Sequence, residues 1–524
     1  MWHYADIQTV PDIVRHYGRV NPEKTAVIQG ARKVDYAELD RTSNRVANAL
    51  IAKGVKPGSV ISYIGKNSLS FFEILFGSSK AGAAVLPLNW RLVGAEIGPI
   101  LQDAVPPIVF ADKDLVSMMT AVKTEYALTF DLVELDASDD NDTRLARWAG
   151  NAADTDPQVA IDPRNTALLM YTSGTTGRSK GVQLSHLGLN YMRLCESLEP
   201  ELRWPSDDVL LMVMPNFHLL GTGIPLQLLY NGGTVSVLPV LEPGRLLDLV
   251  QRDKPSVLVL APTVIQMMLD HPAAKTTDFS SLRLVMYAGS PINAALLKRA
   301  LVEMKCQFMQ FYGATETGGA ATILRPAQHD LVNEQKLKSC GTPLPLIDIK
   351  VVDASGNEMP DGEIGEFLIR APSLFTGYRN QPDTTAAVLK DGWYRSGDAG
   401  YRDASDGLLY IVDRVKDMIV SGGENVYSAE VEQALAKHPA IAMAAVVGAP
   451  DARWGEKVTA IVVLKKDASA SAEDIIKHCR SLIAGFKAPK EVHFAEALPI
   501  SPAGKVLKRV LRDELWKEHG RSVG

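Results

Sequence analysis

The stretch that decides the fold reads ALLMYTSGTTGRSKGVQL and covers residues 167–184. An apolar run at 167–170 leads into a loop of glycine, serine and threonine residues that also carries Arg178 and Lys180. A second strand-like run, Val182-Gln183-Leu184, follows the loop. The pattern therefore predicts a loop that joins two strands, and not a loop that opens a helix.

The loop itself has two interpretations. It does not match the Walker A pattern, because Ser179 stands where the second glycine should be and Gly181 replaces the hydroxyl residue. Successive small residues can still turn their backbone N–H groups around an anion, and Lys180 would complete the charge match. A solvated surface turn and a phosphate-binding loop both remain open at this point.

The regions around the loop predict an α/β protein. From residue 25 to about 270, β-branched runs such as TAVIQG and SVISYIG alternate with helical periodicity. Helices are expected around 36–54, 70–81 and 244–252. Such alternation is typical of βαβ units with largely parallel sheets.

The last third of the chain has a different texture. Between about 340 and 412, short strands broken by Gly, Pro, Asn and Asp predict a compact β subdomain. After Asp413, helices expected at 428–437 and 472–482 alternate with three strand-like runs, which predicts a small α+β unit. The short polar segment DRVKD at 413–417 is a candidate hinge.

The composition excludes several classes of protein. The 524 residues include 61 acidic and 55 basic side chains, for a net charge of −6, which offers no basic surface for nucleic acid. The four cysteines are scattered without metal-binding spacing and are interpreted as reduced thiols of a cytoplasmic protein. The most apolar stretch is interrupted by Lys66, Glu73 and Lys80, so we expect a buried strand and helix and no transmembrane segment. Whether the protein forms a homo-oligomer stays open.

Four further stretches carry residues suited to nucleotide chemistry. They are FYGATETGG (311–319), YRSGDAGYRD (394–403), DRVKDMIVSGGENVYSAEVE (413–432) and PISPAGKVLKR (499–509). Each also has an ordinary structural interpretation: a core strand, a hairpin aspartate, a surface ion pair and a tail lysine. The order of the four stretches along the chain favours the nucleotide-binding interpretation over these structural ones.

In this order the five stretches resemble the adenylate-forming superfamily, which contains acyl- and aryl-CoA synthetases, nonribosomal adenylation domains and beetle luciferases. The resemblance spans about residues 25–515 and is closest to fatty-acid–CoA ligases. It implies a large N-terminal AMP-binding domain at 1–413 with two βαβ-type sheets and the β subdomain at about 340–412. A small mobile α+β lid at 414–524 would rotate about the hinge residue Lys416. The implied cofactors are ATP, Mg²⁺ and CoA, and the implied partner is a hydrophobic carboxylic acid.

The family's reaction has two halves. A carboxylate attacks the α-phosphate of ATP to give acyl-AMP and pyrophosphate, and a thiol then displaces AMP. Because two anions meet in the first half, positive groups must neutralise the developing charge. On the family pattern Lys505 is the main catalytic cation, and Thr172 and Glu316 bind Mg²⁺ through oxygen, the ligand atom that this ion prefers.

The resemblance also implies which residues bind the nucleotide and the acceptor. Thr315 would contact the α-phosphate and the acyl oxygen, Asp398 would bind the ribose hydroxyls, and Arg414 would lie beside it. In the second half, Gly422-Gly423 would replace the Lys505 loop so that a pantetheine arm can pass the backbone. The remaining predicted phosphate and adenine contacts are Ser173, Gly174, Thr175, Thr176, Gly177, Lys180, Gly289, Ser290, Pro291, Tyr312 and Gly313.

The acid is expected to be apolar and larger than propionate. Relatives that activate amino acids place an aspartate in the stretch matching MPNFHLLG, and this chain has no carboxylate there, so a buried ammonium would lack a counter-charge. Acetate-type relatives carry a tryptophan where this chain has Gly313, and His218 resembles the gating histidine of acyl- and aryl-CoA synthetases. The predicted pocket is lined by Phe217, Leu219, Met286, Phe311, Gly313, Gly318 and Gly319. Arg325 is close in sequence to these residues and could pair with a second carboxylate on the acid, so an acid with two carboxylates stays open.

Several alternatives remain besides a medium- or long-chain fatty acid. An aromatic acid such as a benzoate or cinnamate fits the same lining, although Val240 replaces the CoA-contacting lysine of coumarate ligases. The enzyme could instead load a carrier protein from acyl-AMP or oxidise the adenylate as luciferases do. A binding protein without turnover is the last alternative.

Overall fold

The computed structural model describes residues 5–136, 143–172, 179–289, 292–421, 424–451, 453–500 and 506–517. The chain forms two compact units. The first contains Met1–Ile349 and Ile369–Tyr394, and the second contains Lys350–Leu368 and Arg395–Gly524.

One sheet of the first unit is largely parallel. Its strand order is β14, β13, β12, β11, β9, β10, β1 and β2, and the pairings from β13 to β1 are all parallel. The strands are β1 (Thr25–Gln29), β2 (Arg32–Asp35), β9 (Val209–Met212), β10 (Thr234–Val237), β11 (Val257–Leu260), β12 (Leu284–Ala288), β13 (Gln307–Ala314) and β14 (Gly319–Leu324). Strand β15 (Ser339–Pro343) pairs with β14 in the antiparallel sense. One face of this sheet shares a hydrophobic core with α9 (Pro243–Asp253), α10 (Pro262–Asp270) and α11 (Ala294–Met304).

The second sheet of the first unit holds the strands of the glycine-rich loop. Its order is β18, β8, β7, β4, β3, β5 and β6. The bounds are β3 (Val60–Ile64), β4 (Ala84–Leu88), β5 (Ile108–Asp112), β6 (Asp131–Leu135), β7 (Thr166–Thr172), β8 (Lys180–Ser185) and β18 (Gly377–Tyr378). The pairings from β7 to β6 are parallel, and β8 pairs in the antiparallel sense with both β7 and β18.

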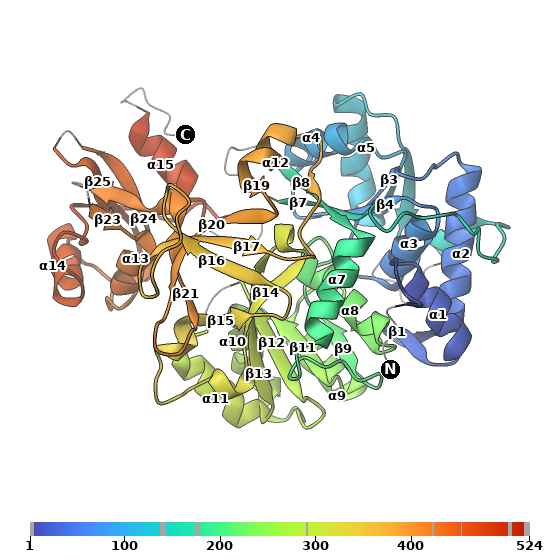
Figure 1. Cartoon of the computed structure of the whole chain (residues 1–524), viewed down its shortest axis with the longest axis horizontal. Helices are drawn as coiled ribbons and strands as arrows, with labels where there is room; N and C mark the ends of the chain where they lie inside the picture. Colours follow the sequence, from blue (N-terminus) through green and yellow to red (C-terminus); the bar gives the residue numbers. More distant parts are fainter. Residues whose placement is uncertain are drawn as a thin grey trace. The chain divides into compact units, whose positions relative to one another are not determined.

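Helices complete the first unit, and α2 lies beside both α1 and α3 (Figure 1). They are α1 (Asp12–Val20), α2 (Tyr36–Ala52), α3 (Leu69–Lys80), α4 (Gly94–Ala104), α5 (Val116–Glu125), α6 (Arg144–Ala149), α7 (His186–Ser197), α8 (Leu219–Tyr230) and α12 (Pro382–Val388). The apolar stretch around α3 is buried, as expected. Lys80 at its end is fully buried and donates to Asp40 Oδ1 at 2.5 Å and Asn44 Oδ1 at 2.6 Å.

The second unit combines two groups of strands. It contains most of the neighbouring strands β16 (Asp348–Val352), β17 (Gly365–Arg370), β20 (Trp393–Arg402) and β21 (Leu409–Arg414). A second sheet has the order β23 (Glu424–Val426), β22 (Ile419–Ser421), β25 (Gly455–Leu464) and β24 (Ile441–Asp451), with β26 (Glu491–Phe494) parallel to β25. Helices α13 (Ser428–Ala436) and α14 (Ala472–Leu482) share its hydrophobic core, and α15 (Lys508–Trp516) packs on β24.

The predicted α/β class, with a large sheet-containing N-terminal part and a smaller C-terminal part, is confirmed. Helices α2, α3, α9, α13 and α14 lie within two residues of the expected bounds. The sequence did not predict the short helix α12 or the helix α15. The division into an N-terminal domain and a lid at residue 413 stays a prediction.

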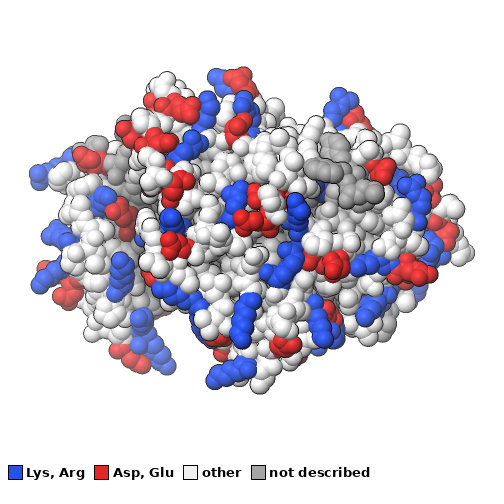
Figure 2. All heavy atoms as spheres, turned by 60° about the horizontal axis from the view of Figure 1, so that its bottom comes forward, with Lys and Arg blue, Asp and Glu red and all other residues white. Residues whose placement is uncertain are grey.

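The described surface mixes both signs of charge. On the face in Figure 2, lysine and arginine side chains alternate with aspartate and glutamate side chains. No helix among the described residues combines the length and the apolarity that crossing a bilayer requires. The cytoplasmic location and any homo-oligomer stay predictions.

Candidate active site

The glycine-rich loop joins two antiparallel strands, as predicted. Thr172 at the end of β7 lies opposite Lys180 at the start of β8, and Tyr171 lies opposite Gly181. A Cβ at Gly181 would lie 2.9 Å from Tyr171 Cζ, so glycine is required where the tyrosine ring covers β8. The loop residues Ser173, Gly174, Thr175, Thr176 and Gly177 lie outside the described residues.

A tight turn carries Thr315 and Glu316. It is the 3₁₀ helix η3 (Thr315–Thr317) between β13 and β14, and it packs against β8. Thr317 Oγ1 accepts a hydrogen bond from Ala314 N at 2.9 Å and donates to the carbonyl of Gly319 at 2.6 Å. These bonds fix the turn from within, so the backbone of Glu316 has a defined place.

The segment 373–378 fixes the same turn from outside. Ser373 Oγ donates to the carbonyl of Thr317 at 2.8 Å, and Phe375 N donates to the carbonyl of Glu316 at 2.9 Å. Gly318 has φ +72°, and a Cβ there would lie 2.3 Å from Ser373 O. The close approach of the two segments therefore requires glycine at position 318.

Tyr378 joins Glu316 to Lys180. Its hydroxyl donates to Glu316 Oε1 at 2.8 Å, and Lys180 Nζ lies 4.9 Å from the centroid of its ring. The structure thus gathers the predicted residues Thr172, Lys180 and Glu316 on neighbouring elements. No pattern within the sequence marks Tyr378 as a site residue, so the sequence did not predict it.

The oxygen atoms of this cluster suit Mg²⁺. Glu316 is buried, and within the described part of the chain only its Oε1 accepts a hydrogen bond, which leaves Oε2 available to a cation. The Thr172 hydroxyl is also a hard oxygen ligand, and Mg²⁺ takes such ligands together with substrate phosphates. The donor set therefore fits the predicted metal.

Gly313 has a local structural role. A Cβ at this position would lie 2.2 Å from the carbonyl oxygen of Gly319 and 3.0 Å from Thr317 Oγ1. The register of the β13–β14 pair also shifts between Tyr312 and Gly313. A side chain at 313 would thus need the backbone of the β13–β14 pair to shift, whatever its effect on the acid pocket.

The predicted acyl residues Phe217, His218 and Leu219 lie where β9 leads into α8. Phe217 is buried, His218 is half-buried, and their ring centroids are 4.7 Å apart. The preceding Asn216 is fully buried, and its amide donates to the carbonyls of Gly65 at 3.2 Å and Lys66 at 3.1 Å. Asn216 therefore fixes the loop to the end of β3.

Arg325 is already paired within the first unit. Its guanidinium donates to both carboxylate oxygens of Glu199, which is buried, and to Thr342 Oγ1 at 2.6 Å. A second carboxylate on the substrate would have to displace this pair, and breaking a buried ion pair is costly.

The predicted adenine contacts lie at the ends of β12 and β13. Gly289 has φ +89°, and the space where its Cβ would lie is open. Tyr312 is half-buried. Ser290 and Pro291 lie outside the described residues.

Asp398 and Arg414 lie together in the second unit. They are paired residues of the β20–β21 ladder, and Arg414 Nε lies 2.8 Å from Asp398 Oδ1. Asp398 is buried and Arg414 is exposed, so the guanidinium covers the carboxylate at the surface of this unit.

The predicted hinge residue Lys416 is exposed in the 3₁₀ helix η6 (Val415–Asp417). Arg512 Nη2 on α15 donates to its carbonyl at 2.9 Å and lies 3.3 Å from Asp417 Oδ1. Lys505, Gly422 and Gly423 lie outside the described residues. Their roles stay predictions.

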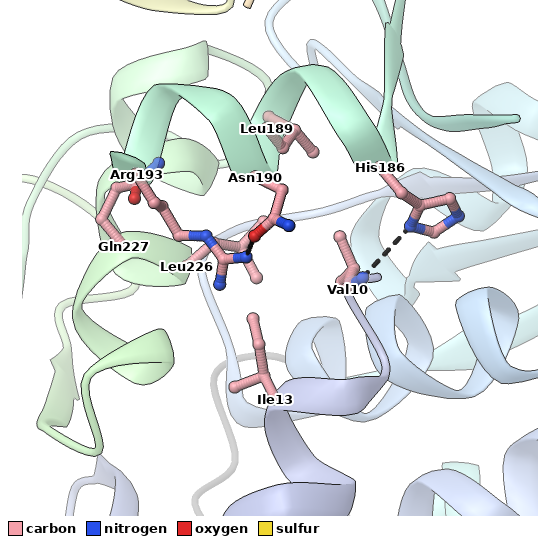
Figure 3. A pocket seen from close by; sticks show the side chains of 8 residues that line it. All are labelled: Val10, Ile13, His186, Leu189, Asn190, Arg193, Leu226 and Gln227. Atoms are coloured by element: carbon pink, nitrogen blue, oxygen red, sulfur yellow. Dashed lines mark hydrogen bonds between the residues drawn. The ribbon is translucent and has the colours of Figure 1, made fainter. Parts of the chain in front are cut away.

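A small cavity between α1, α7 and α8 is a separate feature (Figure 3). Its lining includes Arg193 and Gln227, and its accessible volume of about 10 Å³ is at the lower limit for holding one water molecule. Within the described residues, Arg193 Nε and Nη1 and Gln227 Oε1 have no hydrogen-bond partner. The cavity fits a bridging water and is too small for a carboxylic acid.

Comparison with known proteins identifies the class. Residues 14–379 match the family of AMP-binding enzymes, and residues 430–505 match the AMP-binding enzyme C-terminal domain. The chain therefore belongs to the AMP-binding, adenylate-forming enzymes.

Three similar proteins cover nearly the whole chain. The fatty acid–[acyl-carrier-protein] ligase ScoC of Streptomyces coeruleorubidus is 37% identical over 99% of both chains. A feruloyl-CoA synthase of an Amycolatopsis species is 36% identical over 94% of this chain and 96% of its own. The crystal structure of ATP-bound MatB from Rhodopseudomonas palustris superposes with a TM-score of 0.85 at 30% identity, and covers 98% of this chain and all of its own.

These findings confirm the predicted enzyme class. The chain is an acid–thiol ligase that forms an acyl- or aryl-adenylate and transfers the acid to CoA or to a carrier protein. The predicted cofactors ATP, Mg²⁺ and CoA are confirmed as those of the family's ATP-dependent CoA ligases.

Proposed function

We propose that this enzyme activates a medium- or long-chain fatty acid to acyl-AMP and transfers the acyl group to CoA. The observation that carries the nucleotide half is the cluster of Thr172, Lys180 and Glu316 at the base of the glycine-rich loop. There Lys180 lies over the ring of Tyr378, and Glu316 accepts a hydrogen bond from the Tyr378 hydroxyl. A phosphate chain bound as a Mg²⁺ complex needs both kinds of group.

The polar groups near the predicted acyl pocket support an apolar acid. The Asn216 amide donates hydrogen bonds to the backbone carbonyls of residues 65 and 66, and Arg325 is paired with Glu199. A second carboxylate on the substrate would find Arg325 already paired, and the neutral Asn216 offers no counter-charge to a buried ammonium. The predicted lining residues Phe217, Met286 and Phe311 are buried and apolar.

Transfer to a carrier protein is the second candidate. The observation that favours it is the 37% identity to ScoC, whose name states that it joins a fatty acid to an acyl carrier protein. The similarity to a feruloyl-CoA synthase gives the same kind of support to an aromatic acid.

We further propose that residues 414–524 act as a lid that moves about Lys416. Lys505 would bridge the carboxylate and the α-phosphate in one position of the lid. The segment at Gly422-Gly423 would admit the thiol arm in the other. A long, flexible lysine side chain suits a group that must enter and leave the site.

Pyrophosphate release over a panel of acids tests the proposal. Octanoate, palmitate, benzoate and coumarate are compared, each with CoA, with a pantetheinylated carrier protein and with neither thiol. We expect the fastest release with octanoate or palmitate and a thioester product only when CoA is present. Faster release with the aromatic acids, or a thioester only on the carrier protein, would contradict the assignment.

A further inference from the structure

Tyr378 contacts two charged residues that the nucleotide site needs, although it belongs to neither of their elements. Its hydroxyl lies 2.8 Å from Glu316 Oε1, and Lys180 Nζ lies 4.9 Å from its ring centroid. The side chain is 5% exposed. A buried phenol between a carboxylate and an ammonium is polar at its tip and electron-rich on its face, which matches both neighbours.

The backbone of Tyr378 is fixed independently of these contacts. In the short strand β18 it pairs with Val182 of β8, and its N–H donates to Thr385 Oγ1 at 2.9 Å. Phe375, three residues earlier, packs its ring 4.9 Å from that of Tyr378 and donates its N–H to the Glu316 carbonyl. The phenol therefore reaches Glu316 from a rigid support.

We propose that Tyr378 is a positioning residue for the adenylation step. Its hydroxyl holds Oε1 of Glu316, which would leave Oε2 for Mg²⁺, and its ring face holds the Lys180 ammonium, which would pair with the phosphates. This inference rests on the proposed function of the same site. Groups that orient a metal ligand commonly change metal affinity by 10- to 100-fold when they are removed.

The test is Tyr378→Phe, which removes the hydroxyl and keeps the ring. Pyrophosphate–ATP exchange is measured against Mg²⁺ concentration, and ATP binding is measured by calorimetry with Mg²⁺ and with EDTA. We expect the Mg²⁺ concentration for half-maximal exchange to rise about tenfold. ATP affinity should fall by a similar factor with Mg²⁺ and stay unchanged in EDTA.

Tyr17→Phe is the matched control. Tyr17 is also 5% exposed in the first unit, and its hydroxyl also makes a 2.8 Å bond, to the carbonyl of Tyr230. We expect this variant to keep the wild-type Mg²⁺ dependence, even if its melting temperature falls. An equal shift in the two variants, or none in Tyr378→Phe, would overturn the inference.

A double-mutant cycle covers the case in which Tyr378→Phe is less stable. In the Glu316→Gln background, the tyrosine substitution should have no further effect on Mg²⁺-dependent ATP binding, because its partner no longer holds the metal. Additive losses would overturn the inference. If none of the tested acids supports pyrophosphate exchange by the wild-type enzyme, the proposed function itself fails. That outcome is distinct from a failure of the inference about Tyr378, in which the wild-type enzyme is active.

Discussion

Asp398 and Arg414 face each other across the β20–β21 ladder, with Arg414 Nε 2.8 Å from Asp398 Oδ1. The carboxylate is buried, and the guanidinium stabilises its charge. A carboxylate also accepts hydrogen bonds from hydroxyl groups. The pair is thus suited to recognise a sugar.

The first prediction concerns sugar recognition by Asp398. The wild-type enzyme should prefer ATP to 2′-deoxy-ATP by about tenfold in kcat/KM, the effect of one hydrogen bond to a charged group. Asp398→Ala should remove most of that preference, because both nucleotides then lack the acceptor. Asp348→Ala is the control, since Asp348 pairs with Arg370 on the exposed surface. A preference that survives in Asp398→Ala would contradict the ribose assignment.

The second prediction separates the two half-reactions at Lys505. Lys505→Ala should reduce acyl-AMP formation by at least a thousandfold, because two anions then meet without their bridging cation. Thiolysis of preformed acyl-AMP by CoA should stay within about threefold of wild type. Lys465→Ala, which removes another lysine of the second unit, is the control. Equal losses in both halves would rule out this role.

The third prediction concerns the hinge. Lys416→Pro fixes φ within η6, where Arg512 also binds the Lys416 carbonyl, so the backbone can no longer rotate. We expect thioester formation to slow by at least tenfold more than adenylation does. Lys416→Ala keeps the backbone freedom and should affect both steps only slightly. Parallel slowing of the two steps by the proline would refute a hinge here.

The fourth prediction concerns Gly313. Gly313→Ala places a Cβ 2.2 Å from the Gly319 carbonyl oxygen, and the backbone must shift to accept it. The free energy of unfolding should fall by about 1–3 kcal/mol, as for other overpacked sites. Gly485→Ala, whose Cβ would meet open space, should be nearly neutral. Chemical denaturation of both variants checks this, and equal stabilities would contradict it.

The fifth prediction concerns Glu196 on α7. Burial raises the pKa of Glu196 from its ordinary 4.5 to about 7, so the folded protein holds a proton there that the unfolded chain releases. The resulting stabilisation is complete below pH 4.5 and is lost as the pH rises through 7. Glu196→Gln should therefore gain stability relative to wild type between pH 5 and pH 8.

Chemical denaturation at pH 5 and at pH 8, monitored by fluorescence, measures the difference in free energy of unfolding between the two proteins and so checks the sign. Trp204 Nε1 donates to Glu196 Oε2 at 3.1 Å, and glutamine retains that acceptor. His186, whose pKa burial lowers to about 4, titrates in both proteins and cancels in the difference. A stability difference that is the same at pH 5 and pH 8 would contradict the prediction.

The sequence predicts the parts of this molecule whose signals are local. The apolar periodicity of 36–52 and the alternation around the glycine-rich loop correspond directly to α2 and to the β7–β8 pair. The helix α12 is only 7 residues long, so too few periodic positions exist to mark it.

The residues of the candidate active site could likewise be predicted only where a local sequence signal marks them. Lys180, Glu316 and Asp398 stand in stretches whose order resembles a known family, so they could be predicted without a structure. Tyr378 could not, because its importance comes from contacts with residues that are distant in sequence. The close packing that makes glycine necessary at 313 and 318 is likewise a property of the folded chain.

The path of the chain between its two units has a practical consequence. The polypeptide passes from one unit to the other after Ile349, after Leu368 and after Tyr394, so Tyr378 belongs to the first unit although 350–368 belong to the second. Exchange of the whole second unit with that of a relative therefore needs three junctions. A chimera joined only at residue 413 would keep the recipient's Asp398 and would transplant Lys416 and Lys505 without it.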